Sequence, residues 1–124
     1  MSEIKFVVVD DAIFMRTLLK KMIEEINENY KVVGEGSNGY EAIKQAKEHK
    51  PDVLTMDITM PDMDGLQAIE EVLKVSPDTK IVMCSAMGQQ ALVLESIKKG
   101  ACEFVVKPFE KLVVEKAIKN ALLR

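Results

Sequence analysis

The chain has 124 residues, of which 48% are hydrophobic and 30% are charged, and this composition is that of an ordinary globular domain rather than a disordered chain. Seventeen basic and 20 acidic residues give a net charge of −3, which offers no reason to expect nucleic acid as a direct partner. No apolar run approaches the roughly 20 residues that cross a membrane, and residues 1–6 lack a signal-peptide pattern. We therefore expect a cytoplasmic protein with no membrane partner. Two cysteines and one histidine cannot form the usual four-ligand zinc site.

The first half of the chain predicts two strand–helix units. Ile4 to Val9 is a continuous apolar, β-branched run, which favours a strand covered on both faces. Apolar residues at helical spacing then predict a helix that runs to Ile26. The residues from Tyr30 to Glu35 predict a weaker, more polar strand near an edge of the sheet. A second helix follows from Glu41 to Lys50, and Pro51 ends it.

The second half repeats this alternation three times. Val53 to Asp57 is a short apolar run that ends in an acid, and residues 58–65 contain the proline and glycine of a loop. Within that loop we interpret Asp62 and Asp64 as loop acids. The later elements are expected as a helix around residues 66–73, a strand at 81–84, a helix around 92–97 ended by Gly100, a strand at 104–106 and a last helix over 112–122.

Five strands therefore alternate with five helices, and each crossover is long enough for a right-handed parallel connection. The pattern predicts an α/β protein: a doubly wound, flavodoxin-like, five-stranded parallel sheet with helices on both faces. We adopt the strand order 2-1-3-4-5 as a known order of such sheets, applied here rather than derived. With no linker or repeat in the sequence, we expect one domain over residues 1–124.

Polar side chains follow four of the predicted strands at the point where each strand ends. They are Asp10 and Asp11, then Asp57, Ser85 and Lys107. The ends of parallel strands share one edge of the sheet, so the three carboxylates are expected to converge. Clustered carboxylates raise one another's pKa, and a divalent cation removes that conflict. Oxygen ligands without histidine or cysteine point to Mg²⁺ as the cofactor.

A metal beside a carboxylate suits phosphoryl transfer. We expect Asp57 to act as the nucleophile toward phosphorus, with Lys107 pairing with phosphoryl oxygens and Ser85 donating a hydrogen bond. Each residue also has a plainer interpretation: Asp10 or Asp11 could cap the next helix, Ser85 could be a turn residue and Lys107 a solvated charge.

The two cysteines are expected to be free thiols. Cys84 lies near the end of the predicted fourth strand and Cys102 just before the fifth begins. In adjacent parallel strands that offset is about four residues, or roughly 13 Å. A disulfide needs Cα atoms within about 7 Å of each other.

Taken together, the ordered motifs resemble those of the response-regulator receiver domain. They are Asp10-Asp11, Asp57 with the Met60–Gly65 loop, Ser85-Ala86, and Lys107-Pro108-Phe109. The resemblance covers nearly the whole chain and leaves no residues for an output domain. Within the family, three segments are most similar to single-domain chemotaxis receivers: residues 10–16, 55–61 and 84–90.

The resemblance implies a set of roles for the site. A chemotaxis histidine kinase would supply the phosphoryl group to Asp57. Asp11, Asp57 and the main-chain carbonyl of Thr59 would ligate Mg²⁺, with Asp10 helping through water. The Lys107–Pro108 peptide bond is expected to be cis. Thr59 and Met87 would flank the site, where the family tunes spontaneous dephosphorylation.

The resemblance also implies a switch and an output. Ser85 would move toward the phosphoryl group, and Phe104, which could equally be a core residue, would turn inward. With Pro108 as the third switch residue, the face made by the fourth helix, fifth strand and last helix would change and signal to a flagellar motor switch protein. The expected protein is a monomer, with a phosphatase as a further partner. It is not an enzyme, since it supports only its own phosphotransfer and dephosphorylation.

Two other classes remain open at this point. One is a Mg²⁺-dependent hydrolase with an aspartyl-phosphate intermediate, although such enzymes usually have a second aspartate where this chain has Thr59, and also a cap domain. The other is a phosphorelay intermediate, which passes its phosphoryl group to another histidine phosphotransfer protein. Sequence separates the relay from the motor output poorly, because the partner is the discriminator.

Overall fold

A computed structural model describes residues 2–124, and within them five strands alternate with five helices. The strands form one parallel sheet in the order β2-β1-β3-β4-β5, which confirms the order adopted as a known pattern. The elements are β1 (Ile4–Val9), α1 (Ile13–Ile26), β2 (Tyr30–Gly36), α2 (Gly39–His49), β3 (Val53–Asp57), α3 (Gly65–Val75), β4 (Lys80–Ser85), α4 (Gln90–Lys99), β5 (Glu103–Val106) and α5 (Lys111–Leu122).

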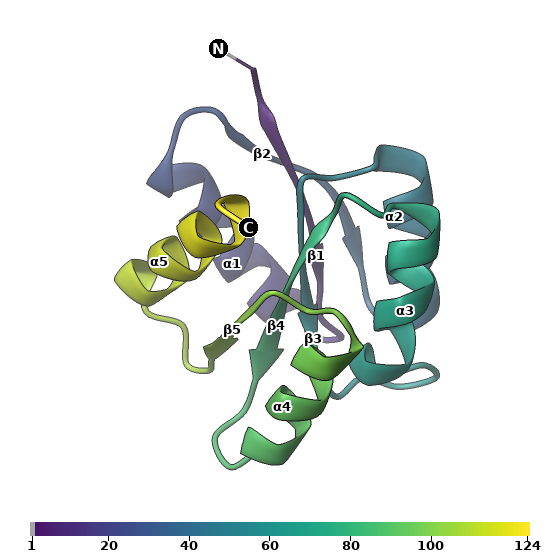
Figure 1. The fold of residues 1–124 in the computed structure, drawn as a ribbon. Helices are drawn as coiled ribbons and strands as arrows, with labels where there is room; N and C mark the ends of the chain where they lie inside the picture. Colours follow the sequence, from purple (N-terminus) through teal and green to yellow (C-terminus); the bar gives the residue numbers. More distant parts are fainter. Residues whose placement is uncertain (1) are drawn as a thin grey trace.

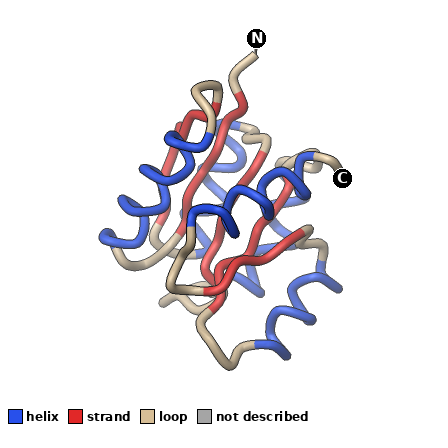
Figure 2. The backbone as a smooth tube through the Cα atoms, turned by 90° about the vertical axis from the view of Figure 1, so that its left-hand side faces the viewer, coloured by secondary structure: helices blue, strands red, loops and turns tan. Residues whose placement is uncertain are grey.

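The helices cover the sheet in two layers, so β1, β3 and β4 are buried on both faces (Figure 1). One apolar core lies between the sheet and α2, α3 and α4, and the other lies between the sheet and α1 and α5. Figure 2 shows the same arrangement from the side, with the strands running between the helices. The continuous apolar runs at Ile4–Val9 and Val53–Asp57 follow from this double coverage.

Strand register brings the polar strand ends to one edge of the sheet. Val9 pairs with Met56, Asp57 with Cys84, and Ser85 with Val106. The residues that follow these pairs, including Asp10 and Lys107, therefore emerge side by side although they lie far apart in the sequence.

Two helix starts differ from the sequence predictions. Helix α2 begins at Gly39, two residues earlier than expected, because the Asn38 side chain caps it by accepting a hydrogen bond from the Glu41 amide. At α1 the N-cap is Ala12 with no side-chain cap, so the interpretation of Asp10 or Asp11 as a helix cap is wrong. Both aspartates are left for other interactions.

Asp64 is also more than a loop acid. Its carboxylate accepts a hydrogen bond from the Gln67 amide at 2.9 Å, and the Gln67 side chain accepts one from the Asp64 amide at 3.0 Å. This reciprocal pair is a capping box, which fixes the start of α3 directly after the loop that follows Asp57.

The two cysteines are free thiols, as the sequence predicts. Cys84 lies opposite Val105 in the β4–β5 register, three residues beyond Cys102. Among residues 2–124, no helix is both long and apolar enough to cross a bilayer.

Candidate functional site

Asp57 is the last residue of β3 and is only 7% exposed. The backbone around it is held closely, since the Gly65 amide donates to the carbonyl of Ile58 at 2.8 Å. A Cβ atom at Gly65 would lie 2.3 Å from the main-chain oxygen of Asp57, so only glycine allows α3 to start this close to β3. The Asp57 carboxylate is thus fixed at the edge of the sheet by its own strand and by the first residue of α3.

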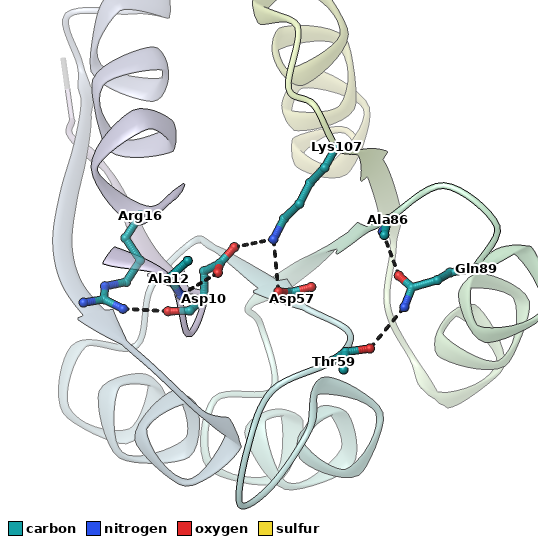
Figure 3. Close-up of polar contacts among 8 residues, drawn as sticks. All are labelled: Asp10, Ala12, Arg16, Asp57, Thr59, Ala86, Gln89 and Lys107. Atoms are coloured by element: carbon teal, nitrogen blue, oxygen red, sulfur yellow. Dashed lines mark hydrogen bonds and ion pairs between the residues drawn. The ribbon is translucent and has the colours of Figure 1, made fainter. Parts of the chain in front are cut away.

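Lys107 connects two of the aspartates (Figure 3). Its Nζ donates to Asp10 Oδ2 at 2.7 Å and to Asp57 Oδ2 at 3.1 Å. Lys107 follows β5 and its amide donates to the carbonyl of Ser85, which ties this strand end to its neighbour. Asp57 Oδ1 makes no hydrogen bond within residues 2–124 and stays available to a ligand.

Asp10 is held at four atoms. Its amide donates to the carbonyl of Gly36, its Oδ1 accepts from the Ala12 amide at 2.9 Å, and its Oδ2 accepts from Lys107. Its carbonyl accepts from Arg16 Nη1 at 2.7 Å, while Arg16 Nε pairs with Glu35 at 3.1 Å (Figure 3). Arg16 therefore positions the turn that carries Asp10 and Asp11, although its sequence position on a helix gave no sign of this.

Carboxylate oxygens of Asp10, Asp11 and Asp57 lie within 4.8 Å of one another. Three carboxylates beside the single ammonium of Lys107 leave an excess of two negative charges, which a divalent cation would balance. Hard oxygen donors at this spacing fit Mg²⁺, which takes few protein ligands and keeps several waters. The structure thus brings together the three carboxylates of the predicted ligand set. The fourth predicted ligand, the main-chain carbonyl of Thr59, lies two residues beyond Asp57 in the sequence.

The pKa values of the two central groups reflect burial and charge. Burial raises the pKa of the Asp57 carboxyl, Lys107 partly offsets this, and the charges of Asp10 and Asp11 add to the rise. For Lys107, burial alone would lower the pKa, but hydrogen bonds to Asp10 and Asp57 outweigh it and raise the pKa above the usual 10.5. Lys107 is therefore a permanent cation at this site.

Two of the predicted switch residues, Ser85 and Phe104, lie on the neighbouring strands β4 and β5. Ser85 ends β4 and is 2% exposed, whereas Phe104 on β5 is 45% exposed. Both line one cavity of about 400 Å³ between the β4–α4 loop, α4 and β5. The Lys107–Pro108 bond is cis, as the resemblance to the receiver family implies.

One residue close to the site had no sequence signal that singled it out. Gln89 reaches from the β4–α4 loop to the loop after β3, where its Nε2 donates to Thr59 Oγ1 at 3.1 Å. Its Oε1 accepts from the Ala86 amide at 2.7 Å (Figure 3). A glutamine in a polar loop is unremarkable until the fold brings these two loops together.

Residues 6–119 match the model of the response regulator receiver domain, and the chain belongs to this family. Within the family it is a CheY-like receiver. It is 53% identical over 114 residues to the chemotaxis protein CheY of Thermotoga maritima, covering 92% of this chain and 93% of that protein. It is 48% identical over 118 residues to CheY of Listeria monocytogenes, covering 95% and 98%.

Solved structures agree with this assignment and with the flavodoxin-like fold. A CheX–CheY–BeF3–Mg²⁺ complex from Borrelia burgdorferi superposes with a TM-score of 0.90 at 28% identity, covering 99% of this chain and 92% of that one. The response regulator domain of Thermotoga maritima CheB gives a TM-score of 0.84 at 34% identity, covering 96% of each chain. The chain is thus a response regulator of the chemotaxis type, a signalling protein of two-component systems.

Proposed function

We propose that Asp57 is the phosphoacceptor of a chemotaxis two-component system and takes its phosphoryl group from a phosphohistidine of a kinase. The observation that carries this proposal is the convergence of Asp10, Asp11 and Asp57 with Lys107 at one edge of the sheet. Two features support it: Asp57 Oδ1 makes no hydrogen bond within residues 2–124, and the Lys107 ammonium lies beside Oδ2 of the same carboxylate.

The chain's own residues account for most of the transfer step. Asp57 Oδ1 attacks phosphorus, the phosphorus–nitrogen bond breaks, and its electron pair goes to the imidazole of the kinase. Lys107, held on Asp57 Oδ2 in the free protein, pairs with the transferred phosphoryl oxygens. Asp11, Asp57 and the carbonyl of Thr59 would hold Mg²⁺, with Asp10 acting through water, and the ion offsets charge on the phosphoryl oxygens when bound.

The proposed output is a change in the face that lies beside the site. Exposed apolar side chains gather on α4, β5 and α5, and we call them the apolar face: Leu94, Ile97, Phe104, Val106, Leu112 and Val113. Phosphorylation would draw Ser85 toward Asp57, and Phe104 would turn into the cavity that both residues line. A flagellar motor switch protein is the proposed partner of this face.

A phosphatase is the further partner that we propose. The site of an acyl phosphate on Asp57 would be open to one, because Asp11 and Thr59 at its rim are exposed. The complex of the Borrelia CheY with CheX supports a third protein beside the kinase and the motor.

The phosphoacceptor is tested with a small phosphodonor and Mg²⁺. The wild-type protein is expected to gain one phosphoryl group, and Asp57→Asn is expected to gain none, because the amide is not a nucleophile toward phosphorus. Intact-mass measurement reports both results. Equal labelling of the Asp57→Asn protein would reject the assignment.

The output is tested by binding to motor-switch components with and without beryllofluoride, a stable mimic of the phosphoryl group. Binding that increases with the mimic and is lost when Leu112 on the apolar face becomes Asp supports the motor. Equal binding with and without the mimic favours the alternative, a phosphorelay intermediate that passes its phosphoryl group to another histidine phosphotransfer protein.

A further inference from the structure

We propose that Gln89 is a positioning residue that holds the site in its unphosphorylated arrangement, by joining the loop after β3 to the loop after β4 through one carboxamide. The inference rests on the proposed phosphorylation of Asp57. It concerns how strongly the chain resists the change that follows, and it assigns a role to a residue outside the metal ligands, the phosphoacceptor and the switch pair.

The bridge uses both ends of the Gln89 carboxamide (Figure 3). Oε1 accepts the Ala86 amide hydrogen at 2.7 Å, and Nε2 donates to Thr59 Oγ1 at 3.1 Å. Within residues 2–124 this is the only side-chain hydrogen bond between the β3–α3 loop and the β4–α4 loop. The first loop directly follows Asp57 and carries Thr59, and the second directly follows Ser85.

Gln89 stands at the start of α4, where a side chain commonly caps the helix. Gln89 is the N-cap residue of α4, yet its side chain makes no cap hydrogen bond to its own helix. The start of α4 is left without a side-chain cap while the carboxamide turns toward Ala86 and Thr59. The side chain is thus committed to joining the loops rather than to its own helix.

The two anchors of the bridge explain why it opposes the switch. Ala86 directly follows Ser85, so a hydrogen bond at the Ala86 amide fixes the segment that must move for Ser85 to approach Asp57. Thr59 supplies the carbonyl expected to ligate the metal. In this structure Phe104 is exposed and Lys107 pairs with both Asp10 and Asp57, so the bridge belongs to the arrangement without a phosphoryl group. A contact made only in that arrangement lowers the apparent affinity for a phosphoryl mimic.

The experiment measures beryllofluoride binding to the full chain at saturating Mg²⁺ by NMR titration. Gln89→Met keeps the length of the side chain and removes its hydrogen bonds. We expect Gln89→Met to bind the mimic about three- to tenfold more tightly than wild type, because one or two modest hydrogen bonds no longer oppose the change. The amide signals of Ser85 and Phe104 should also shift toward their mimic-bound positions before any mimic is added.

Two further variants make the test specific. Gln45→Met places the same substitution on a half-buried glutamine of α2, away from the switch cavity and without a side-chain hydrogen bond among residues 2–124, and its affinity should stay within about twofold of wild type. Thr59→Val removes the hydroxyl anchor and keeps the carbonyl, so combining it with Gln89→Met should add little to either variant alone. If Gln89→Met folds poorly, Thr59→Val carries the same expectation of tighter binding.

The outcomes separate this inference from the function on which it rests. Tighter binding by Gln89→Met or Thr59→Val, with Gln45→Met unchanged, supports the bridge. If wild type binds the mimic and both bridge variants bind it equally or more weakly, the inference is wrong and the phosphoacceptor stands. If wild type does not bind beryllofluoride at all, both proposals fall.

Discussion

At the scale of single residues, burial decides which side chains can change their charge. Cys84 lies on β4 directly opposite Asp57, and it is 2% exposed. Burial raises the pKa of the Cys84 thiol far above its usual value, and the nearby Asp57 carboxylate adds to the rise. Cys84 therefore stays a neutral thiol, which agrees with the proposal that the Asp57 carboxylate is the nucleophile at this edge of the sheet.

Tyr30 shows the same effect away from the site. It is 4% exposed, its ring packs against Phe6 with centroids 4.9 Å apart, and burial raises the pKa of its phenol above the usual 10.0. The unfolded chain loses the phenolic proton at a lower pH than the folded chain does. The contribution of Tyr30 to stability is therefore complete below pH 10 and is lost as the pH rises through the folded pKa.

The expected result is a steeper loss of stability in wild type than in Tyr30→Phe as the pH rises above about 10. The free energy of unfolding from urea titrations measures it, and comparison with Tyr30→Phe cancels the contribution of the lysines, which titrate in the same range. Parallel profiles for the two proteins would contradict the prediction.

At the scale of elements, the start of α3 positions Asp57, the proposed phosphoacceptor. The Asp64–Gln67 capping box fixes the first turn of this helix, and Gly65 lies against the Asp57 carbonyl. We expect Asp64→Ala to lower the free energy of unfolding by about 1 kcal/mol, because the Gln67 amide loses its acceptor. For a domain of this size that corresponds to a fall in Tm of about 4 °C.

Asp78→Ala is the matched control, since Asp78 is exposed, makes no hydrogen bond within residues 2–124 and also lies in a turn. Its free energy of unfolding should stay within about 0.5 kcal/mol of wild type. Thermal unfolding followed by circular dichroism gives both values, and equal stability of the two variants would show that the capping box contributes nothing.

At the scale of the whole molecule, we expect the carboxylate cluster to couple metal binding to folding. Its three acids come from two strand ends that are 46 or more residues apart in sequence and meet only in the folded sheet. Mg²⁺ at about ten times its dissociation constant should therefore raise the free energy of unfolding by about 1.4 kcal/mol. Urea unfolding with and without Mg²⁺ measures this change.

Asp11→Asn serves as the comparison for the metal. Asp11 is exposed and not required by the core, so the variant should fold. Loss of most of the Mg²⁺ stabilisation in Asp11→Asn supports a bound ion at this cluster, whereas an equal gain in both proteins would indicate a general salt effect.

The sequence by itself determined the alternation of elements and the identity of the acids, because periodicity and strand-end residues are local properties. Continuous apolar runs predicted strands covered on both faces, and Asp10, Asp11, Asp57 and Lys107 stood out as polar residues at strand ends. The strand order was applied as a known pattern, and the structure confirms it.

Only the tertiary structure decided which polar residues act together across the chain. The hydrogen bonds from Arg16 to Glu35 and from Gln89 to Thr59 join residues that lie 19 and 30 positions apart, and no local sequence signal links them. A hydrogen bond depends on distances of about 3 Å, and the pairing of strand ends sets those distances. The acids could therefore be identified from residue type and position in the sequence. The hydrogen bonds that position the loops around them could be identified only in the folded structure, where the sheet brings these loops together.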